Sequence, residues 1–232
     1  MEWGKITSEI TGYKLCKREY RQTCTNVKCR RHQQPLEGKI CTSCGLTLKS
    51  SEINKLIEQI PFNPPYQIQY EAPVIKVEVN PGLIAAITDE VNRKKASAIS
   101  QYGNDIPQEL KGLFGGNAVV VALHSMAHQI QLAVPLVVLS STRDVNFNVE
   151  QDDSGIVAYF FDTTDGGNGA SEEIGKHLPL FAAKAMSLAL TCECSDGCPK
   201  CLIQLGCPQQ NQGLHKKVGL FLLEAIVANF ST

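Results

Sequence analysis

Hydrophobic residues recur along the chain in patterns that predict both helices and strands. Residues 83–99 place apolar side chains three or four positions apart, which is the spacing of one face of an amphipathic helix. Residues 118–133 and 214–229 are apolar around most of the helical circumference and predict helices buried under other elements. A further helix is expected over residues 170–190.

Two segments follow strand patterns. Residues 66–79 alternate well enough for one or two strands that end at Asn80-Pro81-Gly82. Residues 155–161 form a nearly continuous apolar run, as in a strand buried on both faces. A short helical pattern over 53–60 and the Pro-rich residues 61–65 predict a boundary, while 135–139 fits either a short strand or the continuation of a helix.

Composition supports a globular chain with a substantial core. The 232 residues are 43% hydrophobic and 19% charged, which suits one domain or a domain with a small appendage. No apolar run follows the first five residues, so we expect no secretory signal and a cytoplasmic location. Residues 112–142 carry no charged side chain, but His124, Gln129 and Pro135 interrupt them. We therefore expect a buried core helix and no membrane partner.

Charge is strongly segregated although the net charge is only −1. Residues 14–49 contain nine Lys or Arg against two Glu, while residues 143–173 contain one Arg against eight Asp or Glu. Tyr13 and Tyr20 lie within or beside the basic segment and offer stacking surfaces for unpaired bases. This basic patch fits nucleic-acid binding, a solvated loop, or docking to an acidic partner. The candidate nucleic-acid contacts are Lys14, Lys17, Arg18, Arg21, Lys28, Arg30 and Arg31.

The first of two cysteine clusters lies inside the basic segment. Two pairs of cysteines at short spacing in a reducing compartment indicate a structural zinc site, because four sulfurs on two turns can converge on one ion. Cys16 or His32 could substitute for a member of the looser first pair. The predicted zinc ligands are Cys24, Cys29, Cys41 and Cys44.

The second cluster follows the helix predicted over 170–190. Four cysteines within ten positions again indicate zinc, since the alternative is a set of reactive thiols without partners. Cys207 could replace one of them. Ligation by sulfur alone leaves no position for water, so both sites are expected to be structural rather than catalytic. The predicted ligands are Cys192, Cys194, Cys198 and Cys201.

The second half of the chain resembles the MrfA-type zinc-binding (MZB) domain. The resemblance spans His124 to Ile226: strand 155–162, the Asp165-Gly166-Gly167-Asn168-Gly169 turn, a helix, the second cysteine cluster, and Cys207 before an apolar helix. This domain occurs at the C-terminus of superfamily 2 DNA helicases and in the DrmB protein of DISARM phage defence. There it is implied to hold nucleic acid or brace the motor, and a motor is what this chain lacks.

Other motifs give weaker functional signals. The glycines after Asp165 do not match a phosphate-binding loop, and the acidic side chains around them would repel phosphate. A tight strand-to-helix turn is the favoured role of this loop, with a metal or substrate role for Asp162 and Asp165 as the alternative. His124 and His128 share a helix face but lack the Glu of a zinc hydrolase motif, so they are expected to be core histidines.

We therefore expect an α+β protein with a small N-terminal zinc knuckle or ribbon and a mixed α/β, MZB-like domain with a four-cysteine zinc site. The expected parts are a basic zinc module over 1–60, a strand-helix connecting region over 61–115 and the MZB domain over 116–232. The leading hypothesis is a non-catalytic accessory subunit of a separately encoded superfamily 2 helicase that binds DNA, preferably single-stranded, in phage defence or DNA repair. The alternatives are a protein–protein adaptor that binds no nucleic acid, and a hydrolase using Asp162, Asp165 and His124.

Overall fold

The computed structural model describes residues 2–26, 29, 31, 36–114, 116–152, 155–194 and 197–230. They form a four-stranded sheet in the order β1-β2-β4-β3 together with α-helices, which confirms the α+β prediction. Lys28, Arg30 and His32 lie outside the described residues.

Four strands form the sheet. β1 (Glu2–Thr23) neighbours β2 (Lys49–Glu78), and β3 (Val145–Asp152) lies at the other edge. β4 (Gly155–Asp162) pairs antiparallel with both β2 and β3, so that Val77 and Val149 both stand opposite Ala158. β4 confirms the strand predicted over 155–161, and β2 contains the one predicted over 66–79.

Contacts divide the chain into two compact units. The larger unit comprises Met1–Ile6, Tyr70–Gly103 and Gln108–Thr232, and the smaller comprises Thr7–Gln69 with Asn104–Pro107. The larger unit therefore holds β3, β4, the helices and the ends of β1 and β2. The three-part division of the sequence at residues 60 and 115 stays a prediction.

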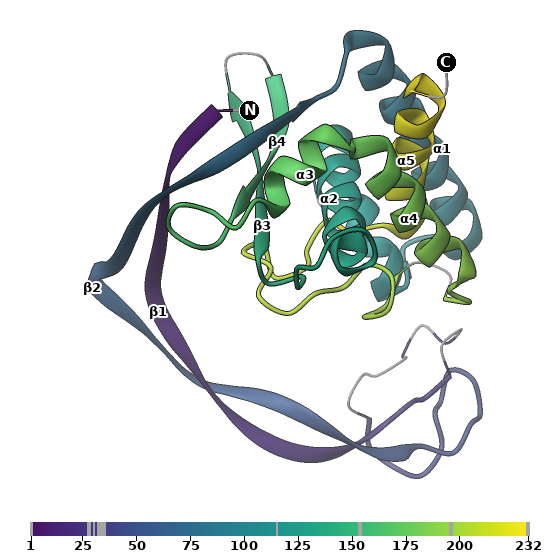
Figure 1. The fold of residues 1–232 in the computed structure, drawn as a ribbon. Helices are drawn as coiled ribbons and strands as arrows, with labels where there is room; N and C mark the ends of the chain where they lie inside the picture. Colours follow the sequence, from purple (N-terminus) through teal and green to yellow (C-terminus); the bar gives the residue numbers. More distant parts are fainter. Residues whose placement is uncertain are drawn as a thin grey trace. The chain divides into compact units, whose positions relative to one another are not determined.

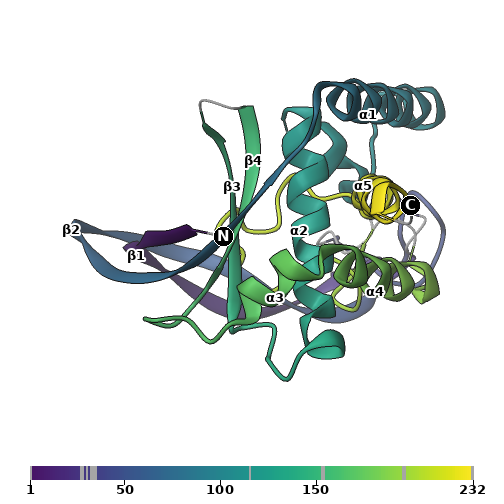
Figure 2. The same ribbon diagram turned by 45° about the horizontal axis from the view of Figure 1, so that its top comes forward.

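Helix α2 (Ala118–Val137) is the centre of the larger unit. It contacts β3 and β4 on one side and α1, α4 and α5 on the other, as Figure 2 shows. The Asn117 side chain caps its first turn by accepting a hydrogen bond from the Val119 amide. By length and composition alone α2 could cross a membrane, but 78% of its most apolar window is buried inside the protein. A core helix of this kind meets the same criterion.

The remaining helices are α1 (Pro81–Tyr102), α3 (Ala170–Lys176), α4 (Leu178–Thr191) and α5 (Lys216–Phe230), with a short 3-10 helix, η1 (Gln108–Phe114) (Figure 1). α1 is capped at its start by Asn80, whose side chain accepts from the Leu83 amide, and is followed at its end by Gly103 with φ 58°. Both features follow from the residue types, because Asn caps helix starts and glycine takes a positive φ without strain.

Two sequence expectations need correction, and one choice was left open. The helix predicted over 170–190 is two helices broken at His177, because Pro179 lacks the amide hydrogen that a continuous helix needs there. The helical pattern over 53–60 lies in β2, where Leu56 and Ile57 are exposed and bury no helix face. Residues 135–137 continue α2, which settles the choice that the sequence left open there.

Candidate metal centres

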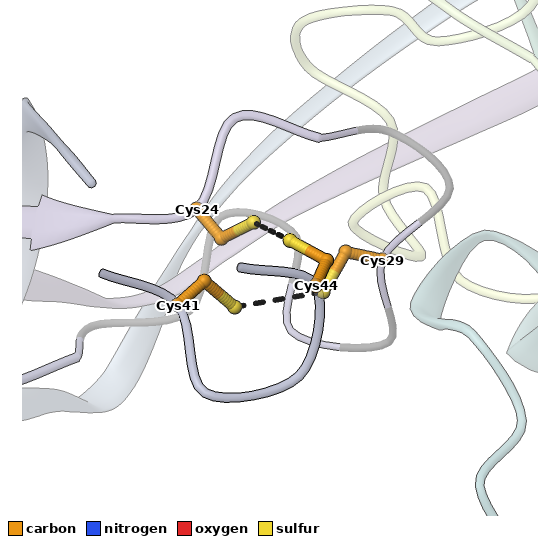
Figure 3. A group of neighbouring side chains, drawn as sticks. All are labelled: Cys24, Cys29, Cys41 and Cys44. Carbon is orange, nitrogen blue, oxygen red and sulfur yellow. Dashed lines mark hydrogen bonds between the residues drawn. The ribbon is translucent and has the colours of Figure 1, made fainter. Parts of the chain in front are cut away.

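Cys24, Cys29, Cys41 and Cys44 come together in the smaller unit (Figure 3). Their sulfur atoms all lie within 4.8 Å of one another, with Cys24 and Cys44 at 3.5 Å and Cys29 and Cys41 at 3.7 Å. All four are free thiols. We call this group the first tetrad. Of the described cysteines, Cys16 is exposed on β1 and belongs to no group that could hold a metal.

A tight hairpin carries the second pair of the first tetrad. Ile40 and Thr47 form an antiparallel bridge, and the Gly45 amide donates to the Cys41 carbonyl at 2.8 Å. Gly45 has φ 73°, which only glycine adopts without strain. The two-residue gap in the sequence therefore forms the turn that was expected, with both sulfurs on its inner side (Figure 3).

The first tetrad is itself most of the core around it. Cys24, Cys29, Cys41 and Leu48 are the buried members of this hydrophobic cluster, with Leu36 and Cys44 packed against them. So small an apolar cluster cannot offset the backbone entropy lost when the loops become ordered. A metal ion bound by the four sulfurs would supply the missing stabilisation.

The thiols of the first tetrad differ in acidity. The backbone amide of Ser43 donates to the Cys41 sulfur and lowers the pKa of that thiol to about 6. Burial raises the pKa of Cys24 to about 12 and also raises the pKa of Cys29. A metal-free tetrad near pH 7 therefore keeps protons on Cys24 and Cys29, and a bound cation must displace them.

Cys192, Cys194, Cys198 and Cys201 form the second tetrad, in the larger unit. Neighbouring sulfurs are 3.4 Å apart for Cys192 and Cys198, 3.4 Å for Cys194 and Cys201, and 4.0 Å for Cys198 and Cys201. Cys192 directly follows α4, and the Cys198 carbonyl accepts hydrogen bonds from the amides of Cys201 and Leu202. A helix end and a tight turn thus bring the four sulfurs together.

Lys216, the first residue of α5, supports the second tetrad. Its ammonium group donates to the carbonyl oxygens of Cys192 and Cys194, both at 2.7 Å, and lies 3.7 Å from the Cys194 sulfur. The residue is only 5% exposed. A zinc ion with four thiolates keeps a net negative charge, so this buried cation offsets it. Sequence reasoning missed Lys216, because nothing in the spacing links it to the cysteines.

Both tetrads fit zinc. Four sulfurs about 2.3 Å from a zinc ion stand about 3.8 Å apart at the corners of a tetrahedron. The observed separations of 3.4–4.0 Å lie close to that value. They are far from the roughly 2 Å of a disulfide. The eight predicted ligands thus form the two expected groups, and each group could hold a metal ion.

The acidic loop after β4 has a structural arrangement. One carboxylate oxygen of buried Asp162 accepts from the amides of Asn168 and Gly169, both at 2.8 Å, and the other accepts from the Ser171 amide at 2.7 Å. Asp165 accepts from the Glu71 amide at 3.2 Å. Both oxygens of Asp162 therefore hold the loop at the start of α3, and the side chain is fully buried.

The basic residues of the described N-terminal strand are exposed. Side chains alternate along a strand, so Lys14 and Arg18 lie on one face of β1, and Lys17 and Arg21 lie on the other. Arg21 pairs with Glu19 at 2.9 Å, and Lys55 reaches the same carboxylate at 3.6 Å. Arg31 is exposed in the first tetrad's loop, where its amide donates to the Cys29 sulfur. The structure thus leaves these side chains on the surface but does not gather them on one face.

Cys207 does not join the second tetrad. It lies with His124 and His128 in a third group of side chains that could hold a metal. The sequence had offered Cys207 as a spare zinc ligand and the histidines as core residues. The pair of histidines is indeed buried, but the partner sulfur, 83 positions from His124, was not foreseeable from spacing.

The sequence of part of the larger unit matches a known domain family. Residues 126–202 match the family model of the MrfA Zn-binding domain. The resemblance seen in the sequence is confirmed over this range. The matched MZB segment runs from α2 through β3, β4, α3 and α4 to the end of the second tetrad. It includes His128 but stops short of both Lys216 and Cys207.

Individual proteins are similar over different lengths. An uncharacterized protein of Methanocaldococcus jannaschii is 24% identical over 112 residues, which are 46% of this chain and all of that protein. Two crystal structures of the DUF1998 helicase MrfA, one bound to DNA and one to DNA and AMPPNP, show TM-scores of 0.42 and 0.41 at 16% and 15% identity. They cover 94% of this chain, which spans about a quarter of their length, 26% and 23% respectively.

Proposed function

We propose that this chain is a non-catalytic, zinc-binding accessory subunit of a separately encoded superfamily 2 DNA helicase, acting in the cytoplasm. The observation that carries the proposal is the match of residues 126–202 to the MrfA Zn-binding domain, with a cysteine tetrad at the end of the matched segment. Four sulfur ligands leave a zinc ion no site for water, so the two tetrads would brace the protein rather than perform chemistry.

Nucleic-acid binding is the contribution that we propose for the smaller unit. Lys14 and Arg18 are exposed on one face of β1, which also carries Tyr20, whose exposed fraction is 73%. Cationic side chains on a strand pair that a zinc tetrad holds would contact phosphates, and an exposed aromatic ring offers a stacking surface to an unpaired base. The proposed ligand is therefore single-stranded DNA. The process that we propose is phage defence or DNA repair.

Binding of a fluorescent single-stranded oligonucleotide, measured by anisotropy at several salt concentrations, tests this proposal. Replacing Lys14 and Arg18 by Ala together should weaken binding and lower the slope of log affinity against log salt by about 1.4, because about 0.7 counterions are released per phosphate contact on a single strand.

The matched control replaces two exposed lysines of the larger unit, Lys111 and Lys184, by Ala. The control should bind like the unchanged protein. Equal losses in both double variants would show a diffuse charge effect and contradict an interface on β1. Absence of salt-dependent binding together with a stable helicase complex would favour the protein–protein adaptor instead.

A further inference from the structure

A third cluster of metal-binding side chains lies in the larger unit, outside both tetrads. His124 and His128 stand one turn apart on α2, with their Nε2 atoms 3.1 Å from each other. The Cys207 sulfur lies 3.3 Å from the His124 Nε2. Both histidines are buried, and the three ligand atoms all lie within 4.8 Å of one another. Three potential ligand atoms thus converge on one point.

The hydrogen bonding of His128 leaves its Nε2 available as a ligand. Its Nδ1 lies 2.9 Å from the Leu202 carbonyl oxygen, which can only accept, so Nδ1 carries the proton. In the neutral ring the Nε2 atom then holds a lone pair directed at His124. Burial favours that neutral ring, since it lowers the pKa of His128 to about 3 and that of His124 to about 4. Histidines that bind metals are oriented in the same way, through the other ring nitrogen.

We propose that His124, His128 and Cys207 bind a third zinc ion. Two imidazole nitrogens and one thiolate are ligands that zinc accepts. In a tetrahedral zinc site the nitrogens stand about 3.4 Å apart, and a nitrogen and a sulfur about 3.6 Å apart. The observed 3.1 Å and 3.3 Å need to lengthen by only a few tenths of an ångström.

This site differs from the tetrads because it has only three protein ligands. His128 and Cys207 line a cavity of about 600 Å³ whose wall also includes Phe147 and Gly206. The fourth coordination position can therefore be filled by a water molecule or a small anionic ligand that enters from the cavity, as in zinc sites that keep an open position. Such an exchangeable position is what the two sulfur-only tetrads lack.

The surroundings hold the three ligands in place. The Phe147 ring packs against both imidazoles, with centroid distances of 5.0 Å to His128 and 5.9 Å to His124. Leu202, whose carbonyl orients His128, directly follows the second-tetrad residue Cys201. An ordered second tetrad is thus expected to hold His128, one ligand of the third site, in place. This inference is independent of the proposed function.

Zinc content and the ligand environment of the unchanged, reduced protein give the first test. Three zinc ions per chain are expected, and X-ray absorption at the zinc edge should show an average of about three sulfurs and about one nitrogen or oxygen per zinc, with the scattering pattern of imidazole. Two zinc ions per chain with sulfur ligands alone would overturn the proposal. This measurement does not depend on whether any variant folds.

Variants give the second test. Cys207→Ser and His124→Gln should each lose one zinc ion per chain and the imidazole signal while keeping the sulfur-only sites. Cys16→Ser is the matched control, because Cys16 is exposed and belongs to none of the three clusters. If Cys207→Ser keeps the same zinc content and spectrum as Cys16→Ser, then His124 donates a hydrogen bond to His128 without a metal and the third site does not exist.

Discussion

Lys216 shows how one side chain supports a metal centre without binding the metal. Its ammonium group holds the carbonyl oxygens of Cys192 and Cys194 from the first turn of α5, while the ligands themselves follow α4. It thereby joins α5 to Cys192 and Cys194, which lie 24 and 22 positions earlier in the chain. The position therefore combines hydrogen bonding, charge compensation and a tertiary connection in one buried residue.

Replacing Lys216 by Met should destabilise the protein by about 2 kcal/mol or more, because two partly buried carbonyl groups lose a charged donor. Chemical denaturation of the zinc-loaded protein would measure the change. The next residue, Lys217, is exposed, so Lys217→Met removes the same charge without these bonds. Equal stabilities of the two variants would show that Lys216 contributes nothing to the second tetrad.

The turn from β4 into α3 is an element for which the sequence favoured a structural role. A metal or substrate role for Asp162 and Asp165 was the alternative. The glycines of the turn do not match a phosphate-binding loop, and Asp162 accepts three backbone hydrogen bonds inside the turn. Gly167 has φ 72°, and a Cβ atom there would come within 2.8 Å of the Asp162 carboxylate. The carboxylate and the glycines therefore form one structural turn.

Asp162→Asn should destabilise the larger unit by about 2 kcal/mol or more, since the amide group would turn a donor toward backbone donors. Thermal and chemical unfolding would measure this loss. Asp165→Asn, at an exposed hydrogen bond of 3.2 Å, should change the stability far less. A stable Asp162→Asn variant that has lost a bound metal ion would support the metal-binding alternative instead.

Elements whose apolar side chains are buried could be predicted from the sequence, and exposed ones could not. The helices α1, α2 and α5 and the strand β4 were expected because their apolar side chains are buried in the larger unit. β1 was missed because its side chains are exposed almost throughout, so no face imposes an alternation. β3 was missed because it lies in a segment rich in acidic residues, although its Val145 and Phe147 are buried.

At the scale of the whole molecule, metal ligands close together in the sequence were predictable and distant ones were not. The eight cysteines of the tetrads have short spacings that themselves indicate turns with converging sulfurs. The cluster of His124, His128 and Cys207 depends on how α2 packs against the segment after Cys201, which is tertiary information. The two histidines alone fit a core helix equally well.

Each of the two units contains one cysteine tetrad. The two units differ in the size of the hydrophobic core beside the tetrad. The second tetrad adjoins a large hydrophobic core that packs around α2. The first has little besides Leu48 and Leu36. Metal binding and folding should therefore be most tightly coupled in the smaller unit.

Hydrogen exchange of the segment 36–48, before and after zinc removal from the reduced protein by a strong chelator, tests the central claim most directly. The amides of Cys41, Gly45 and Leu48 donate to backbone carbonyls around the first tetrad and should be protected while zinc is bound. Removal of zinc should abolish this protection, while the amides of α2 lose far less. A reduced, zinc-free protein that protects the segment 36–48 equally well would contradict the account.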